Sequence, residues 1–432
     1  MKKLLSILIA LIALLNFNSC NDEAVDVDTV NKQTILVFLP WTGSAYGSGL
    51  YSDFCNNLDS IEKGIVEKKG LSNSRVLVFL SKPKTNSGSY DKSYLYELKY
   101  NETEKKVDEV ELKTYEGNSY ATAEGLTGLL NDVKSNAEAL NYAMIIGSHG
   151  CGWTYKDDWQ SYPYNAKEHQ GWTEAKTSKS AKTIATNSQS SSFAGWDAHP
   201  LTRFVGSMSD SDYAIDITTL AQGIEASGIK MQYILFDACY MSNVETAYEL
   251  RNATNYLVAS ASEVMAIGMP YTSIWTYLNS ATPNYSSIVS SFNSFYSSYS
   301  APYGNLAAID CREMESLAAV MKDINTKYPT IDSEKLAGVQ KLGGFQPTIY
   351  YDLGNYIDSL VPTGYLKDQF TTQLKKTVKA SQSTSQVLSA LYSSTELIDI
   401  NTFSGLTISD PSSNAVAVRG REKCSWWKAT HE

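Results

Sequence analysis

The feature that most constrains the fold is a series of short, almost continuously apolar runs. They are rich in β-branched and aromatic residues and lie at 34–40, 75–81, 142–150, 233–240, 256–262 and 306–311. Apolar runs without polar alternation are typical of strands that are buried on both faces. Amphipathic stretches of helical length lie between them, at about 50–69, 121–138 and 217–228, with another opening at Ser242. Strands that alternate with helices predict an α/β sandwich around a mainly parallel sheet.

Two segments depart from this alternation. Residues 94–100 and 110–116 alternate apolar with polar side chains, which predicts an exposed hairpin added to the sheet. Residues 153–213 are instead rich in Ser, Thr and Lys and contain few large apolar side chains. So long a segment inside a compact domain is either a functional loop or a disordered one.

The C-terminal third of the chain has a different character. Helical patterns return at 312–328 and 366–381, and a short strand-like run follows at 403–410. We therefore predict one α/β domain at 34–311 and a helical accessory region at 312–432 that packs on it.

The N-terminus has the pattern of an export signal. A positive start, an apolar run of twelve residues and a polar exit that ends at Cys20 predict a signal peptide over 1–20, too short to span a membrane. Cys20 is the expected lipid attachment site; the alternative is a cysteine that merely follows a signal-peptidase cut. Residues 21–33 then form an acidic tether. We expect an exported protein, lipid-anchored at the outer membrane or cell surface, with no other membrane contact.

Charge and cysteine content narrow the function. The chain has 36 Lys and Arg against 46 Asp and Glu, a net charge of −10, which argues against nucleic-acid binding and is compatible with basic partners. Apart from Cys20, five widely spaced cysteines remain. An odd number leaves at least one thiol unpaired, and the spacing resembles neither a disulfide scaffold nor a zinc knuckle. A free cysteine is therefore a candidate nucleophile.

His149 and Cys239 both follow predicted strands. In an open α/β sheet, reactive groups gather beyond the carboxyl ends of the strands. Cys239 also precedes a predicted helix with Ser242 as N-cap and Glu245 completing a capping box, so the helix dipole would favour the thiolate. Either residue taken alone is more often structural, but their joint placement points to a Cys–His pair.

The residues around this pair resemble a known family. "IIGSHGCGW" at 145–153, and "ILFDACYMSNVETAYEL" at 234–250 followed by "LVASASE" at 257–263, resemble the clostripain family of cysteine peptidases, relatives of caspases, legumains and gingipains. The likeness covers roughly 34–310. It implies a caspase-like α/β/α sandwich and an endopeptidase that cuts after Arg or Lys through a thioester acyl-enzyme.

The resemblance also implies roles for individual residues. His149 would be the general base and Cys239 the nucleophile, with the backbone N–H groups of Gly150 and Cys239 as the oxyanion hole. Asp237 would receive the basic side chain that precedes the cut bond, since it lies two residues before the nucleophile on the same side of the strand. The alternative is that Asp237 caps the following helix. Glu263 lies in the family's "ASE" pattern without a role that the sequence defines.

The family also matures by cutting itself after a basic residue between the histidine and the cysteine. The predicted cleavage sites are Lys176, Lys179 and Lys182, in "AKTSKSAK". We expect a monomer that becomes two chains after this cut. The alternative is an ordinary solvated loop that is never cut.

Metal and cofactor requirements are expected to be minimal. The His-x-Cys spacing of His149 and Cys151 could suggest a metal, but no second ligand pair lies nearby, so no metal site is predicted. The mechanism requires no cofactor. Only the resemblance suggests calcium, because clostripain uses it. The sequence has no Asp-rich loop of the kind that holds calcium. Residues 262–275 differ from the Gly-rich, more acidic segment of the family. The preference for Arg or for Lys before the cut bond therefore stays open.

Together these observations predict an exported, lipid-anchored cysteine endopeptidase acting on protein or peptide substrates with Arg or Lys before the cut bond. The alternative from another class is a non-catalytic surface lipoprotein of the same fold, whose Tyr-, Ser- and Asn-rich loops bind a peptide or a glycan.

Overall fold

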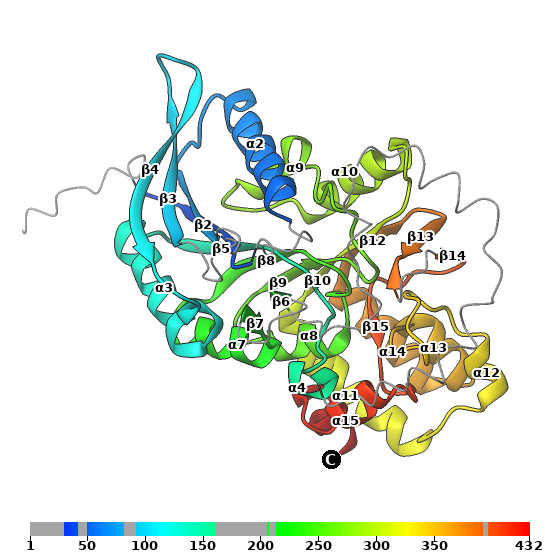
Figure 1. The fold of residues 1–432 in the computed structure, drawn as a ribbon. Helices are drawn as coiled ribbons and strands as arrows, with labels where there is room; N and C mark the ends of the chain where they lie inside the picture. Colours follow the sequence, from blue (N-terminus) through cyan, green and yellow to red (C-terminus); the bar gives the residue numbers. More distant parts are fainter. Residues whose placement is uncertain (1–29, 42–49, 82–91, 161–204, 207–212, 392–395) are drawn as a thin grey trace, which may run out of the picture.

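The six apolar runs form the six strands predicted from them. The computed structural model describes residues 30–41, 50–81, 92–160, 205–206, 213–391 and 396–432 (Figure 1). The strands are β1 Gln33–Leu39, β2 Ser74–Ser81, β5 Asn141–Gly147, β8 Met231–Asp237, β9 Tyr256–Ala259 and β10 Asn305–Asp310. All six belong to one nine-stranded sheet, in the order β12-β10-β9-β8-β5-β1-β2-β3-β4.

The centre of the sheet is parallel, as predicted. β1 pairs with β2 and β5, β5 with β8, and β8 with β9, all in parallel register. The predicted hairpin is also present: β3 Ser93–Asn101 and β4 Lys106–Tyr115 extend the sheet beyond β2 in antiparallel register. Its predicted exposure is wrong for β3, because five of the first six residues of this strand are buried. At the other edge, β10 runs antiparallel to β9.

Helices cover both faces of the sheet (Figure 1). One layer contains α2 Tyr51–Glu67, α9 Tyr271–Leu278 and α10 Tyr285–Ser298; the opposite layer contains α3 Ala123–Asn136, α7 Ile217–Ala226, α8 Val244–Glu249 and α11 Met314–Lys327. Alternate residues of β1 enter the two cores, Val37 the first and Phe38 the second. Because each large apolar side chain stabilises by about 1.5–3 kcal/mol when fully buried, both faces hold the sheet in place.

The region after residue 311 is mostly helical, and it also contributes to the central sheet. Its helices include α13 Leu353–Leu360 and α14 Tyr365–Thr377. The helix predicted over 366–381 is therefore wrong at its end, because Val378–Ser383 form strand β12. β12 pairs antiparallel with β10 and satisfies backbone groups that would otherwise lie at an open sheet edge.

Shorter elements complete the fold. They are η1 Ser119–Ala121, α4 Lys156–Gln160, β6 Val205–Gly206, β7 Ala214–Ile215, η4 Cys311–Glu313, α12 Ser333–Ala337, β11 Tyr351–Asp352, β13 Gln386–Ser389, β14 Glu396–Asp399, β15 Thr407–Ile408, α15 Ala415–Arg421 and α16 Ser425–His431. The strand expected at 403–410 is reduced to β15, which pairs with β11. No helix in the described ranges combines the length and apolarity needed to cross a membrane.

Candidate active site

The sheet reverses its order of connection at β1. β1 pairs with β2 on one side and with β5 on the other, and such a switch point is where open α/β sheets bind ligands, beyond the carboxyl ends of the strands. β5 and β8 are neighbours, and Gly147 at the end of β5 pairs with Asp237 at the end of β8. His149 and Cys239 each follow two residues later. The structure therefore brings both residues to the same edge of the sheet, on adjacent segments.

Trp41, which follows β1 at the same edge of the sheet, lies against His149. Trp41 is buried, and its ring centroid lies 5.2 Å from that of His149, with the ring planes tilted by 46°. A buried indole beside an imidazole limits the orientations that the imidazole adopts. The sequence analysis did not identify Trp41, although its position directly after the first buried strand was a usable signal.

Gly150 packs directly on the backbone of Cys239. A Cβ atom at residue 150 would lie 2.5 Å from the carbonyl oxygen and 2.9 Å from the nitrogen of Cys239, and 2.9 Å from the Cβ of Ala238. Two of these three atoms are backbone atoms, which have little freedom to move away. The residue after His149 must therefore be glycine for the two segments to approach this closely.

Replacing Gly150 with Ala is expected to separate the two segments. Overpacking of this kind typically costs about 1–3 kcal/mol of stability, and displacement of the predicted oxyanion-hole donor should cost about 10²-fold or more in kcat. Peptide hydrolysis and thermal unfolding of the variant measure both effects. Gly128→Ala in α3 is the matched control, because a Cβ atom there meets nothing within 4 Å. Equal activity of the two variants would contradict this account of Gly150.

The nucleophile candidate Cys239 lies on a segment with a fixed backbone. Its side chain is half-buried, and the Val264 N–H lies 3.3 Å from its sulfur as donor. Tyr240 has φ 59°, and its N–H donates to the carbonyl of Ser262 over 2.9 Å. Left-handed backbone at a bulky residue costs about 1–3 kcal/mol and persists only where neighbours hold it. The Tyr240 ring, stacked on Tyr350 at 5.3 Å, supplies part of that restraint.

The helix that follows Cys239 begins later than predicted. α8 begins at Val244, and its N-cap is Asn243, whose side chain accepts from the Thr246 N–H over 2.7 Å. The predicted capping box of Ser242 and Glu245 is wrong. The Ser242 hydroxyl donates to the carbonyl of Gly405 over 2.6 Å, and Glu245 accepts from the Ser409 N–H over 2.7 Å. Both side chains thus bind the C-terminal region instead of closing the helix end.

Asp237 is a buried carboxylate on the face of the sheet covered by α9. Its Oδ2 accepts from the Tyr271 hydroxyl over 2.8 Å and from the Met269 N–H over 3.2 Å. Burial raises the pKa of the Asp237 carboxyl to about 6, although both hydrogen bonds lower it. Since Asn243 is the N-cap of α8, the alternative role of Asp237 as the cap is wrong.

Asn57 of α2 is a second acceptor beside Asp237. Its Nδ2 donates to the carbonyl of Ile267 over 2.8 Å, whereas its Oδ1 is buried and has no hydrogen-bond partner in the described part of the chain. Gly268, with φ +70°, lies between the two side chains: a Cβ there would be 2.6 Å from Asp237 Oδ2 and 3.0 Å from Asn57 Oδ1. Two buried oxygens therefore converge on one space. No local pattern in the sequence marks Asn57, because its role depends on the packing of α2.

Glu263 of the "ASE" pattern connects this segment to the C-terminal region. Its carboxylate accepts from the hydroxyls of Tyr240 and Ser389, each over 2.8 Å, and from the Ala390 N–H over 3.0 Å. Glu263 thus holds the residue after Cys239 against the end of β13. This is a structural role that the sequence left undefined.

Cys151 is buried in the core beside His149. Its carbonyl accepts from the hydroxyls of Tyr350 and Thr154. Within the described residues, no group of three or more His, Cys, Asp or Glu side chains is placed to hold a metal ion. The calcium that the family resemblance suggested stays a prediction, and no step below uses it.

The predicted lipid and cleavage sites lie outside the described residues. These are Cys20, Lys176, Lys179 and Lys182.

Comparison with known proteins identifies relatives over almost the whole chain. The sequence profile of the clostripain family matches residues 192–415, which include Asp237 and Cys239 and exclude His149. A secreted C11 cysteine protease from Bacteroides thetaiotaomicron, "iotapain", is 37% identical and has a TM-score of 0.76, covering 93% of this chain and 99% of that one. No curated protein matches.

Two further crystal structures are similar. A clostripain from Bacteroides thetaiotaomicron, in complex with the peptide inhibitor BTN-VLTK-AOMK, is 45% identical with a TM-score of 0.50, covering 53% of this chain and 99% of that one. An inactive zymogen C11 protease from Parabacteroides distasonis is 23% identical with a TM-score of 0.69, covering 94% and 99%, and supports the fold alone.

Proposed function

Because this chain belongs to the clostripain family of cysteine peptidases, we propose that it cleaves peptide bonds after Lys or Arg, with Cys239 as nucleophile and His149 as general base. The observation that carries the proposal is the contact of Gly150 with the Cys239 backbone. The residue after His149 thus lies directly against Cys239, at the edge where open α/β sheets bind ligands.

The chemistry follows from this arrangement. His149 takes the proton of the Cys239 thiol, and the sulfur attacks the carbonyl carbon of the substrate. The N–H groups of Gly150 and Cys239 stabilise the negative oxygen of the tetrahedral intermediate, and His149 returns its proton to the departing amine. Water, deprotonated by His149, then attacks the thioester and releases the second product. The burial of Trp41 beside the imidazole keeps the base oriented through both steps.

Asp237 and Asn57 are the proposed receptor of the basic side chain. A buried carboxylate is costly without a cationic partner, and a substrate ammonium or guanidinium supplies one. The unpartnered Oδ1 of Asn57 offers a second acceptor for the same group. A 45% identical clostripain was crystallised with a peptide inhibitor whose sequence, VLTK, ends in lysine. This supports a basic residue before the cut bond of the substrate.

We also propose export, lipid anchoring at Cys20 and maturation by self-cleavage at Lys176, Lys179 or Lys182. The signal-like N-terminus supports export, as does the description of the 37% identical relative as secreted.

Self-cleavage predicts a mass difference between two purified proteins. Wild type is expected to show two chains by intact-mass analysis, whereas Cys239→Ala shows one, because the cut depends on the nucleophile. A variant with Lys176, Lys179 and Lys182 all replaced by Gln should also remain a single chain. Identical single-chain masses for wild type and Cys239→Ala would remove self-processing from the proposal.

The peptidase activity is tested with fluorogenic peptides that end in Lys, Arg, Ala or Glu. Purified wild type lacking the signal is expected to turn over the Lys and Arg peptides alone. An absence of turnover by the mature protein would favour the non-catalytic binding protein of the same fold.

A further inference from the structure

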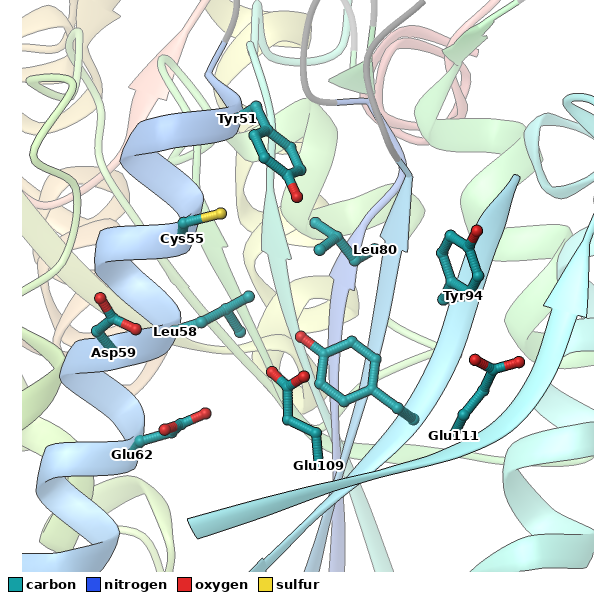
Figure 2. A pocket seen from close by; sticks show the side chains of 10 residues that line it. Tyr51, Cys55, Leu58, Asp59, Glu62, Leu80, Tyr94, Glu109 and Glu111 are labelled. Carbon is teal, nitrogen blue, oxygen red and sulfur yellow. The ribbon is translucent and has the colours of Figure 1, made fainter. Parts of the chain in front are cut away.

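A pocket of about 480 Å³ lies outside the proposed active site, between α2 and the hairpin of β3 and β4 (Figure 2). None of the residues proposed for catalysis or specificity lines it. α2 separates the two sites. Asn57 on one side of the helix contacts the segment next to Asp237, whereas Tyr51, Asp59 and Glu62 face the hairpin. The spacing of these three residues, i, i+8 and i+11, places them on one face of the helix.

The charge of this pocket is strongly negative. Asp59 and Glu62 from α2 face Glu109 and Glu111 from β4, and none of the described lining residues is Lys or Arg. None of the four carboxylates has an ion-pair partner among the residues that the structure describes. Burial, with the charges of Glu109 and Asp59 next in importance, raises the pKa of the Glu62 carboxyl to about 7. A bound cation would relieve this repulsion.

A tyrosine hydroxyl in the lining of the pocket provides an independent indication of a ligand. Tyr96 lines the pocket, and its side chain is only 8% exposed. Its hydroxyl has no hydrogen-bond partner among the described residues, unlike that of Tyr115, which donates to Asp132 over 2.6 Å. Because the rest of this side chain is packed and its hydroxyl bonds to no described residue, the hydroxyl is available to a ligand that enters the pocket.

The lining fits an organic cation better than a metal ion. Tyr51, Tyr94 and Tyr96 offer aromatic rings to a cation, and Leu58 and Leu80 offer apolar surface to an alkyl chain. In contrast, no described set of three or more acidic, His or Cys side chains is arranged to hold a metal. A Lys or Arg side chain has both an apolar stem and a cationic end.

We infer that this pocket binds the Lys or Arg side chain of a polypeptide substrate at a second site, away from the bond that is cut. The assignment of the ligand as a substrate side chain rests on the proposed peptidase function. The binding chemistry, an alkylammonium or guanidinium group among carboxylates and tyrosines, is independent of that function. A free polyamine offers the same chemistry, and the experiment separates the two sources.

The first measurement is direct binding by NMR titration, with the blocked lysine Nα-acetyl-lysine amide as probe. The protein is the full mature chain carrying Cys239→Ala and Asp237→Asn, which removes turnover and the proposed specificity carboxylate. In this background, Glu62→Gln with Glu109→Gln is expected to weaken binding about ten-fold, since each partly exposed charge contact contributes up to about 1 kcal/mol.

The matched control is Glu67→Gln with Glu102→Gln, in the same background. It changes the same net charge on the same helix and hairpin, at exposed positions that do not line the pocket. Its affinity should equal that of the background protein. Equal affinities of the pocket variant and the control variant, or absence of binding, would overturn the inference even if the peptidase is active.

The second measurement identifies the source of the cation. Each fluorogenic peptide has one cleavable Lys and one D-arginine, after which the enzyme does not cut. A Gly/Ser spacer of increasing length separates the two residues. At least one spacer is expected to lower KM about five-fold relative to a D-alanine peptide, and the gain should disappear in the Glu62→Gln, Glu109→Gln variant alone. Pocket-dependent binding of spermidine without any gain from D-arginine would overturn the assignment to a substrate side chain. A loss of all turnover would instead contradict the proposed function and leave the binding result intact.

Discussion

Replacing Cys239 with Ala is expected to lower kcat/KM for a Lys-ending peptide by about 10⁴-fold or more, because the acyl-enzyme then has no sulfur on which to form. Cys239 is half-buried at the end of a segment held by backbone hydrogen bonds, so the loss of one sulfur atom should leave the melting temperature within a few degrees of wild type. Kinetics and thermal unfolding of the same preparation measure both quantities.

The matched control for this variant is Cys151→Ala. Cys151 lies two residues after His149 and is buried, and we assign it no part in the chemistry. The variant should retain most of its kcat/KM while losing about 1 kcal/mol of stability for the cavity it creates. Turnover that survives in Cys239→Ala but disappears in Cys151→Ala would reverse the assignment of the nucleophile.

Replacing Asp237 with Asn is expected to reduce kcat/KM for Lys-ending and Arg-ending peptides by about 10²-fold or more. Removing one partner of a buried charge pair typically costs 2–5 kcal/mol, or roughly 30-fold to several thousand-fold. The hydrogen bonds from Tyr271 and Met269 to Oδ2 suit an amide oxygen equally well, so the fold should be retained. The rate at which uncharged iodoacetamide modifies Cys239 should change little, which separates specificity from chemistry.

The same carboxyl predicts a dependence on pH. Its pKa is raised to about 6 by burial, so in the free protein it loses its charge as the pH falls through that value. A neutral Asp237 no longer attracts a cation, and kcat/KM for Lys peptides should therefore fall below about pH 6. Asp237→Asn should lack this fall. A similar acid limb in both proteins would assign it to another group.

The sequence was sufficient to predict the strands and the sheet edge at which we propose the chemistry. β5 and β8 are nearly continuous apolar runs, as expected for parallel strands that are buried on both faces. The carboxyl ends of parallel strands meet at one edge of the sheet. His149 and Cys239 could therefore be placed together without knowledge of any tertiary contact.

The remaining features depend on contacts between distant parts of the chain. Ser242 and Glu245 have the local pattern of a capping box, but their side chains bind Gly405 and Ser409, which no local pattern reports. Val378–Ser383 continue a helical pattern and become a strand because β10 offers an edge. Asn57 acquires its place beside Asp237 only through the packing of α2.

The central claim, that Cys239 attacks the carbonyl that follows a basic residue, is tested most directly by covalent labelling. A peptide that ends in lysine and carries a reactive acyloxymethyl ketone is added to the mature protein, and the modified residue is located by proteolytic mapping and mass spectrometry. We predict a single adduct on Cys239, formed at least about ten-fold more slowly in Asp237→Asn. An adduct on Cys55, Cys151, Cys311 or Cys424, with Cys239 unmodified, would contradict the account.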